Sequence, residues 1–547
     1  MQARPFEEGE YRSFREMLER LARIQPDHPA FSGLGEDGRI RTISFAALYE
    51  EVSCLGDGLL AAGLGQAHVA IVSRDCSRYA VALLSALCGS AVVVPLDARA
   101  PQPLLEALLE RSDAVAVLCD SANLSRVLAA QRKLPRLRNV IILEGRADGV
   151  LSYDGLLASG REPYNRGRFL RLEPDPDAMR MILFSSGTTG TNKGVMLSPA
   201  NLLSNVQSLL STGAIPEEAH RMSLIPLHHA ACIAFTLMSL ALGMQNCFCG
   251  DLRDCMTLFR LFRPERIQTV PLMIESFYRQ IRAAARKAGL QKSGPQTARD
   301  LFGGRLRSIA CGGAALRPEL IRDMYEAGIV VHNLYGTTEC GPGIAVNADT
   351  AHDPLTVGPP LPGLEIRLDD PDEHGAGTLC VRGKSIALGY YKDPDATRAV
   401  FGPDGFFNTG DSVRITEDGR ILHLGRKAST LVLPSGENLH PQEIEQLIAS
   451  RMDFVTEAVV YLAGLTLGKA TREVLCAGLY IPDPDLRADR ARIAAGIQRI
   501  NQDLPAFARI DYIELPDTAY PRTTSLKLRR TTLPQTCSGD GILLTES

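Results

Sequence analysis

Short apolar runs recur near the start of the chain, and longer stretches with helical spacing of apolar positions lie between them. Runs of four or five residues that are rich in valine and isoleucine are typical of buried strands. Strands that alternate with helices predict an α/β fold built on mainly parallel sheets. These predicted strands are residues 69–73, 91–95, 115–119 and 139–143.

Two longer apolar runs, residues 80–94 and 230–244, need a separate interpretation. Each is shorter than the roughly 20 residues that a membrane-spanning helix requires, and both contain serine and glycine. We therefore expect each to be a buried helix that leads into a strand. A further helix is predicted to begin at Pro199, because Ser198 is a good N-cap and proline is favoured at the first helical position.

The pattern changes near Lys427, and we expect a domain boundary there. Residues 421–425 end one strand. A new strand follows, then a Pro-Ser-Gly turn at residues 434–436 and a helix that begins near Pro441. This fresh start of strand and helix is typical of a second folding unit.

The length of 547 residues exceeds a single hydrophobic core, because domains hold roughly 150 residues each. We expect a large N-terminal domain, residues 1–426, of mainly parallel sheets flanked by helices. A small mobile C-terminal α+β domain, residues 427–547, is expected to follow it. The residues after Leu533 are predicted to form a flexible tail.

Composition narrows the range of partners. A net charge of −4 and a hydrophobic fraction of 45% do not indicate the excess of positive charge that binding to nucleic acid or an anionic membrane requires. We therefore expect small-molecule partners. The thirteen cysteines are scattered without a CxxC pair, which disfavours a disulfide framework or a zinc site. Residues 1–13 lack the apolar core of a secretory signal, so a cytoplasmic location with reduced thiols is expected.

A Ser/Thr/Gly-rich loop directly follows the apolar run that begins at Met181. Its glycines can adopt positive φ and expose successive backbone N–H groups to an anion, while hydroxyls and a lysine add donors and charge. The loop is therefore predicted to bind phosphate. It departs from the GxxxxGK[ST] pattern of P-loop NTPases, because its lysine follows the second glycine by three positions. The candidate phosphate-binding residues are Ser185, Ser186, Gly187, Thr188, Thr189, Gly190 and Lys193.

Four further motifs follow in order along the chain. They are HNLYGTTE at residues 332–339, FNTGD at 407–411, GRKASTLVLPSGENLHPQEIE at 425–445 and PRTTSLKLR at 521–529. Together with the loop, they resemble the motifs of the adenylate-forming (ANL) superfamily, and the third resembles its form in fatty-acyl-CoA synthetases. The resemblance runs from about residue 45 to residue 533, which is nearly the whole chain.

The resemblance implies an enzyme that uses ATP and Mg²⁺. Lys527 matches the catalytic lysine that bridges the α-phosphate and the substrate carboxylate, two anions that repel each other. Thr338 matches a catalytic donor to the α-phosphate, and Glu339 matches the magnesium ligand, a hard oxygen donor. The other nucleotide-binding positions are Gly313 and Ala314 at the adenine edge, Tyr335 against its face, Gly336, Thr337, and Asp411 and Arg426 at the ribose.

The segment after His229 indicates the class of acid. Residues 230–250 contain no charged residue, whereas amino-acid-activating relatives place an aspartate there to pair the substrate amine. An α-amino acid is therefore disfavoured. Small apolar side chains leave volume for an acyl tail, so we expect a medium- or long-chain fatty acid or a similarly apolar acid. The candidate substrate residues are His229, Ala231, Cys232 and Gly341; a satisfied core histidine is the alternative for His229.

The resemblance also implies two reactions in one cleft. The acid and MgATP form an acyl-adenylate and pyrophosphate, and the small domain then moves so that the thiol of coenzyme A enters beside Ser435, Gly436 and Glu437. An acyl carrier protein is the alternative thiol donor. A non-catalytic nucleotide-binding protein of the same fold is the alternative of another class. Two positions depart from the family, because Ala428 replaces the Asp or Lys of the hinge and Leu526 replaces the glycine before the lysine.

Overall fold

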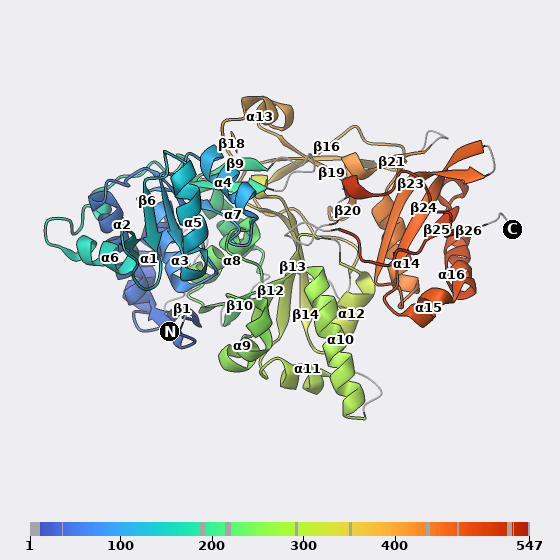
Figure 1. The fold of residues 1–547 in the computed structure, drawn as a ribbon, viewed down its shortest axis with the longest axis horizontal. Coiled ribbons are helices and arrows are strands. Elements are labelled where there is room, and N and C mark those ends of the chain that lie inside the picture. Colours follow the sequence, from blue (N-terminus) through green and yellow to red (C-terminus); the bar gives the residue numbers. More distant parts are fainter. Residues whose placement is uncertain are drawn as a thin grey trace.

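A large N-terminal part and a smaller C-terminal unit lie side by side in the structure (Figure 1). The C-terminal unit, coloured orange to red, holds the last long strands and helices. The computed structural model describes residues 11–35, 37–185, 192–213, 220–289, 294–314, 316–348, 353–433, 438–467, 470–521, 528 and 530–544.

The first sheet contains the strands that the sequence predicted near the start of the chain. In the described part of the chain it has eight strands, in which five neighbouring pairs are parallel and the two pairs at one edge are antiparallel. In sheet order they are β18 (Gly389–Tyr390), β9 (Lys193–Leu197), β8 (Met181–Ser185), β4 (Val92–Pro95), β3 (His68–Val72), β5 (Ala116–Cys119), β6 (Asn139–Ile142) and β7 (Leu151–Ser152). The four predicted strands are confirmed as β3, β4, β5 and β6.

Both faces of this sheet are buried, which is why its strands are continuously apolar. In β3, Val69 and Ile71 pack into one core, and Ala70 and Val72 pack into another on the opposite face. One face is covered by α1 (Phe14–Ile24), α2 (Phe45–Ala61), α3 (Ser77–Leu87) and α6 (Tyr153–Arg161). The other face is covered by α4 (Gln102–Arg111) and α5 (Ser121–Lys133).

The second sheet has the same plan. Among the residues described, it again has eight strands, with antiparallel strands only at its two edges. In sheet order they are β15 (Gly343–Asn347), β14 (Val330–Gly336), β13 (Ser308–Gly312), β12 (Arg266–Thr269), β10 (Arg221–Ser223), β11 (Asn246–Phe248), β1 (Pro29–Leu34) and β2 (Ile40–Ser44). Its outer face packs against α9 (Cys255–Phe262), α10 (Pro271–Lys287), α11 (Pro295–Leu301) and α12 (Pro318–Glu326).

Two helices lie between the two sheets. They are α7 (Pro199–Ser211) and α8 (Ala230–Ala241), and both contribute to the core that the sheets share. The predicted start of α7 is confirmed, because the Ser198 side chain accepts from Asn201 N and Pro199 is the first helical residue. Nearly every residue of α8 is buried, as expected for a helix that is apolar on all sides. The runs at 80–94 and 230–244 are thus buried helices that lead into strands.

An antiparallel sheet follows and brings the chain back to the first two. It consists of β16 (Glu365–Asp369), β17 (Ala376–Arg382), β19 (Phe407–Ile415) and β20 (Ile421–Arg426), with α13 (Pro394–Val400) beside it. Its apolar residues pack with Ile344 and Ala345 of β15, the edge strand of the second sheet, and with Cys340 just before that strand. The start of β19 and the end of β20 therefore lie close to the carboxyl ends of the parallel strands.

After β20 the chain forms η4 (Lys427–Ser429) and a short hairpin of β21 (Leu431–Val432) and β22 (Asn438–Leu439), and the C-terminal unit follows. Its main sheet consists of β23 (Glu457–Leu467), β24 (Ala470–Tyr480), β25 (Tyr512–Glu514) and β26 (Ile542–Leu543). One face packs against α14 (Pro441–Arg451) and α16 (Arg490–Asp503), with α15 (Pro484–Ala488) nearby. The predicted helix near Pro441 is α14.

The flexible tail expected after Leu533 is wrong for the residues described there. Ile542 pairs with Ile513 of β25 and packs into the core of the C-terminal unit. The Ser538 hydroxyl donates to Glu514 (2.7 Å), and Leu544 N donates to Asp511 O (2.8 Å). The apolar Ile-Leu-Leu run near the end of the chain supplies a strand that the polar residues before it obscure in the sequence.

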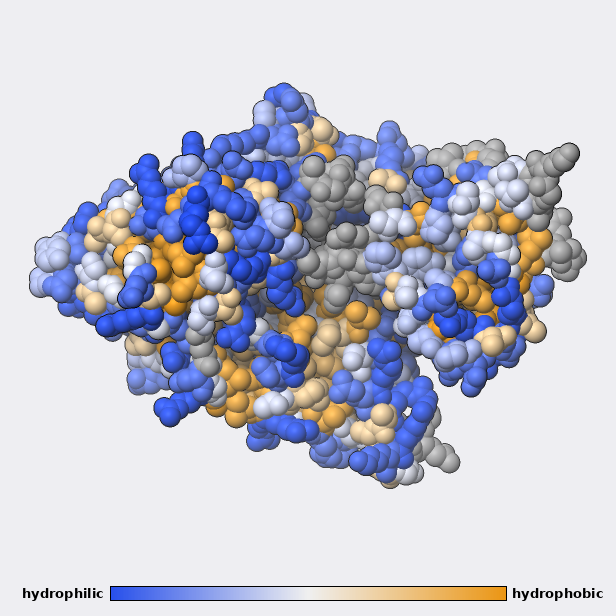
Figure 2. All heavy atoms as spheres, viewed as in Figure 1, coloured by the Kyte–Doolittle hydropathy of each residue, from blue (hydrophilic) through white to orange (hydrophobic). Residues whose placement is uncertain are grey.

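Hydrophilic side chains spread over most of the face shown in Figure 2, with smaller apolar patches between them. Of the helices that the structure describes, none has both the length and the apolar composition that a membrane crossing requires.

Candidate active site

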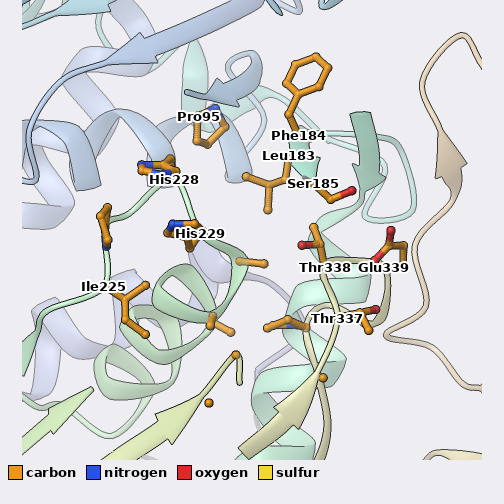
Figure 3. A pocket seen from close by; sticks show the side chains of 18 of the residues that line it. Pro95, Leu183, Phe184, Ser185, Ile225, His228, His229, Thr337, Thr338 and Glu339 are labelled. Atoms are coloured by element: carbon orange, nitrogen blue, oxygen red, sulfur yellow. The ribbon is translucent and has the colours of Figure 1, made fainter. Parts of the chain in front are cut away.

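A cavity of about 810 Å³ opens where the carboxyl ends of the parallel strands meet the antiparallel sheet. Figure 3 shows His228 and His229 on one side of it and Ser185, Thr338 and Glu339 on the other. Segments that are distant in the sequence therefore line the same cavity. The predicted residues on that wall are Ser185, Lys193, His229, Ala231, Gly313, Tyr335, Gly336, Thr337, Thr338, Glu339 and Arg426.

Several predicted residues lie outside the described part of the chain. They belong to the phosphate loop, the segment expected at the thiol, and the lysine loop. They are Ser186, Gly187, Thr188, Thr189, Gly190, Ser435, Gly436, Glu437 and Lys527, and Leu526 is another such position. Their roles stay predictions.

The two ends of the phosphate loop are held together by a hairpin. Ser185 at the end of β8 pairs with Lys193 at the start of β9. A Cβ on Gly194 would lie 3.0 Å from the Ile182 side chain and 3.3 Å from that of Phe184, so only glycine packs there without displacement. The residues on either side of the predicted phosphate loop, Ser185 and Lys193, therefore both line the cavity.

Glu339 is a buried carboxylate at the cavity wall, within η3 (Thr338–Cys340). The Tyr390 hydroxyl donates to its Oε1 at 2.9 Å, and Lys193 Nζ lies 4.8 Å from the centre of the Tyr390 ring. The described residues contain no group of three or more acidic, His or Cys side chains that could hold a metal. A single carboxylate still fits Mg²⁺, which keeps several waters and binds through one or two carboxylates and substrate phosphates.

Asp411 lies just beneath the cavity wall and is 2% exposed. The Tyr335 hydroxyl donates to its Oδ2 at 2.6 Å, and Arg426 Nε lies 2.9 Å from its Oδ1. Burial alone would raise the pKa of Asp411, but His423, Arg426 and Tyr335 together lower that pKa below the usual value, so the carboxylate is ionised.

Asp411, which the sequence predicts at the ribose, has one carboxylate oxygen with an open acceptor position. Among described groups, none donates a well-directed hydrogen bond to Asp411 Oδ1, although the atom is buried. Such an atom needs a donor, and its neighbours Gly410 and Arg426 lie on the cavity wall. Arg426 Nη1 in turn donates to Thr409 O at 2.7 Å. Arg426 is therefore an ion-pair partner of Asp411 and a wall residue at once.

Tyr335 is held in place through both its hydroxyl and its ring. Its hydroxyl is engaged by Asp411, and its ring lies 5.0 Å from the ring of His423. It still lines the cavity, beside Gly313. Gly313 has φ +86°, and a Cβ there would meet nothing, so the backbone is open to a ligand. Ala314 is described but is not on the cavity wall.

Helix α8 forms the uncharged wall of the cavity. Ala230, Ala231, Ala234 and Phe235 line it, at the i, i+1, i+4 and i+5 spacing of one helix face. Cys232 was expected on this wall and is not there. Its Sγ donates to Ser223 Oγ on β10 at 3.1 Å, because a residue one position after Ala231 points about 100° away around the helix.

Gly341 was also expected beside the acyl tail, and it is not on the cavity wall either. It ends η3 with φ +74°, and a Cβ there would lie 2.8 Å from Ser385 O. Its contribution is therefore to the backbone, since it lets the chain turn sharply after Glu339. The next residues, Pro342 and Gly343, do line the cavity.

His229 lines the cavity next to a second histidine that the sequence interpretation had not singled out. The rings of His228 and His229 are 4.3 Å apart. Burial, with a smaller contribution from Arg99, lowers the pKa of His228 to about 4, so its ring is neutral at physiological pH. Asp75 Oδ1 accepts from Leu227 N at 2.9 Å and thereby fixes the loop that carries both histidines.

Tyr390 and Gln268 also line the cavity and were missed by the sequence interpretation. Tyr390 lies in a two-residue strand about 50 positions after Glu339, and no local pattern links the two. Gln268 lies in the four-residue strand β12, whose sequence Arg-Ile-Gln-Thr carries no local sign of a cavity residue.

The residues just after the lysine loop are firmly anchored. Arg530 Nη2 donates to both oxygens of Glu445, at 2.8 and 2.6 Å, and Glu445 Oε1 also accepts from Val460 N. Leu528 packs against the face of the C-terminal sheet that α14 leaves open. The basic run around Lys527 is therefore not simply a solvated surface, because Arg530 belongs to a partly buried ion pair.

Comparisons with known proteins agree with this geometry. The family model described as "AMP-binding enzyme" matches residues 18–391. The peroxisomal long chain acyl-CoA synthetase 6 of Arabidopsis thaliana is 28% identical over 78% of this chain and 66% of its own length. The long-chain-fatty-acid–CoA ligase FadD15 of Mycobacterium bovis is 25% identical over 83% of this chain and 81% of its own. The chain therefore spans slightly less than two thirds of the first relative and about four fifths of the second.

Two solved structures show the shared fold. ATP-bound MatB from Rhodopseudomonas palustris superposes with a TM-score of 0.77 at 24% identity, over 94% of this chain and 97% of that one. The o-succinylbenzoate CoA synthetase of Bacillus subtilis, solved with its acyl-adenylate, gives 0.74 at 21% identity, over 96% and 98%. The family match covers more than half of the residues and includes most of the cavity wall. The chain belongs to the AMP-binding enzyme family and is an adenylate-forming enzyme.

Proposed function

We propose that this AMP-forming acid–CoA ligase activates a medium- or long-chain fatty acid or a similarly apolar acid. The observation that carries the proposal is one continuous cavity with two different ends. One end holds Ser185, Lys193 and Glu339, and the other is the uncharged face of α8. An anionic cosubstrate and an apolar tail can therefore meet in the same space. The names of the two curated relatives support a long acyl chain.

The enzyme uses ATP, Mg²⁺ and coenzyme A. We assign the ribose hydroxyls to Asp411, with Arg426 holding the carboxylate in place. Thr338 would donate to the α-phosphate, and Glu339, held by Tyr390, would be the protein ligand of Mg²⁺. Bound magnesium would screen the phosphate charge. The chain's own contribution is to hold these groups still before the reaction, which is how positioned dipoles and charges lower a barrier.

The acyl tail would lie along α8, beginning near His229. The wall from His229 to Phe235 spans about 9 Å at 1.5 Å per residue. It offers no counter-ion to a substrate amine, because the described residues of α8 carry no charge. An ammonium group placed against α8 would find no carboxylate there, and burying an unpaired charge costs on the order of several kcal/mol.

We assign the thiol step to a movement of the C-terminal domain, residues 427–547. Ala428 lies on the cavity wall beside Arg426 and Lys427, at the start of that unit. A pivot there would exchange the lysine loop for the segment at Ser435, Gly436 and Glu437. Lys527 would bridge the carboxylate and α-phosphate before the movement and leave after it.

A panel of acids tests the substrate class. Pyrophosphate release is measured with octanoic, palmitic, benzoic and α-amino acids, each with coenzyme A or with a phosphopantetheinylated carrier protein. We expect octanoic or palmitic acid with coenzyme A to give the highest kcat/KM. Robust release with an amino acid, or thioester formed only on the carrier protein, would contradict the proposal.

A single lysine tests the order of the two steps. Lys527→Ala should lower adenylation by roughly 100-fold or more, because it removes the charge placed between two anions. Thioester formation from synthetic acyl-adenylate and coenzyme A should persist. Arg522→Ala is the matched control, since it removes a charge from the same segment. Equal loss of both half-reactions in Lys527→Ala would assign this lysine to folding.

A further inference from the structure

The acyl wall contains one buried amide among apolar side chains. Gln268 lies at the end of β12, is 3% exposed and lines the cavity. Its neighbours on the wall include Leu224, Ala231, Val270 and Met273. A purely apolar tail would need no polar group here, and burying an amide without partners costs free energy. Gln268 therefore calls for an explanation beyond the shape of the cavity.

The two hydrogen-bond partners of Gln268 fix the orientation of its amide. Arg221 Nη2 donates to Gln268 Oε1 at 2.5 Å, and Gln268 Nε2 donates to Ala231 O at 3.1 Å. A guanidinium has only donors and a carbonyl has only acceptors, so the oxygen must face Arg221 and the NH₂ must face α8. An NH₂ group has two N–H donors. Within the described residues, the second N–H has no acceptor.

Arg221 places a buried positive charge next to this amide. It is 2% exposed, and its hydrogen bonds go to the neutral side chains of Ser239, Asn246 and Gln268. No carboxylate of the described residues forms an ion pair with it. Burial lowers the pKa of Arg221 to about 10, which still leaves it charged at neutral pH. Its charge polarises the Gln268 amide and makes the free N–H a stronger donor.

The polar character continues behind the wall. Arg221 is in register with Arg266 on the neighbouring strand β12, so both side chains lie on the same face of the sheet. A small cavity of about 10 Å³, with room for about one water, adjoins this face and is lined by Thr212, Phe235, Arg266 and His332. Phe235 also lines the main cavity, so it separates the two spaces.

We propose that Gln268 is a specificity-determining residue for an apolar acid that carries an oxygen acceptor in its tail. A hydroxyl, keto or carboxylate oxygen of the tail accepts a hydrogen bond from the second N–H of Gln268. Arg221 is the positioning residue, because its bond to Gln268 Oε1 fixes the orientation of the amide. This inference rests on the proposed function, because it assumes that the tail lies along α8. It narrows the substrate from apolar acids in general to oxygenated ones.

The first experiment compares octanoic acid with octanoic acids that bear one hydroxyl or keto oxygen at successive carbons, and with octanedioic acid. Pyrophosphate release gives kcat/KM for each. We expect at least one oxygenated acid to exceed octanoic acid by about tenfold, the usual effect of satisfying one buried donor. Octanoic acid as the best substrate would overturn the inference. If no acid supports release, the proposed function itself fails.

Variants assign the preference to Gln268. Gln268→Leu should reduce the oxygenated-to-plain ratio of kcat/KM to about one. The double variant Arg221→Met with Gln268→Leu removes both members of the pair, so it leaves no buried charge without its acceptor and should fold. Met273→Leu, a volume-conserving change on the same wall, is the control and should keep the ratio. If the folded double variant keeps the oxygenated-to-plain ratio of kcat/KM, the assignment to Gln268 is overturned. Equal loss of activity on all acids in Gln268→Leu would also overturn it, because that result shows a purely structural role for Gln268.

Discussion

Asp411→Asn isolates the charge at the proposed ribose position. The variant side chain has the same shape and can still accept from the Tyr335 hydroxyl, which lies 2.6 Å from Oδ2. What it loses is the negative charge that the proposal assigns to the ribose hydroxyls. Hydrogen bonds to a charged group contribute about 1.5–3 kcal/mol each, so we expect the KM for ATP to rise about ten- to hundredfold. The fold should also lose stability, because an Asn oxygen kept on Tyr335 turns its NH₂ group toward Arg426 Nε, which lies 2.9 Å from Asp411 Oδ1.

The assay measures pyrophosphate release at varied ATP and at varied 2′-deoxy-ATP. The wild-type enzyme should prefer ATP, and Asp411→Asn should lose most of that preference, because the carboxylate no longer distinguishes the sugar hydroxyls. Tyr335→Phe is the control that removes the neighbouring hydroxyl and leaves the charge. An unchanged KM for ATP in a folded Asp411→Asn variant would refute the ribose assignment and leave the ion pair with Arg426 as a structural feature.

Three further predictions concern other parts of the cavity. Ala231→Leu fills the α8 wall, so kcat/KM should fall first for the longest acids, and an unchanged chain-length profile would place the tail elsewhere. Ala428→Pro restricts the proposed pivot, so adenylation should persist while thioester formation falls; equal loss of both half-reactions in a folded variant would move the pivot. His228, with a pKa of about 4 against about 6.5 when unfolded, stays neutral in the fold while the unfolded chain binds a proton, so stability should fall as pH decreases. Between pH 7.5 and 5 the loss should be about 2 kcal/mol, measured by denaturant midpoints, and His228→Gln should remove it; an identical pH dependence in the two proteins would show that another group titrates.

The sequence predicted the elements whose signal is local. The strands β3 to β6 and the start of α7 follow from apolar runs and from capping residues next to them. The motifs also predicted one shared site for residues of β8, η3 and β20, and these residues line the same cavity. These predictions succeed because a buried parallel strand must be apolar throughout, and a helix must satisfy its first N–H groups.

The sequence failed where a contact joins distant segments. The donation from Tyr390 to Glu339 and the pair of Arg221 and Gln268 depend on how the sheets pack, which no local pattern records. The error at Cys232 has a different cause, since the residue lies on the predicted helix but on its other face. The composition of α8 was readable from the sequence, but its rotation about its own axis was not.

The central claim is that an apolar acid is activated as an adenylate and then transferred to coenzyme A. A single-turnover experiment tests it directly: enzyme is mixed with MgATP and octanoic acid, and coenzyme A is added after a delay. We predict a burst of pyrophosphate close to one per enzyme before coenzyme A arrives, followed by AMP and octanoyl-CoA after it. Release of ADP and phosphate, or octanoyl-CoA without earlier pyrophosphate, would contradict the account.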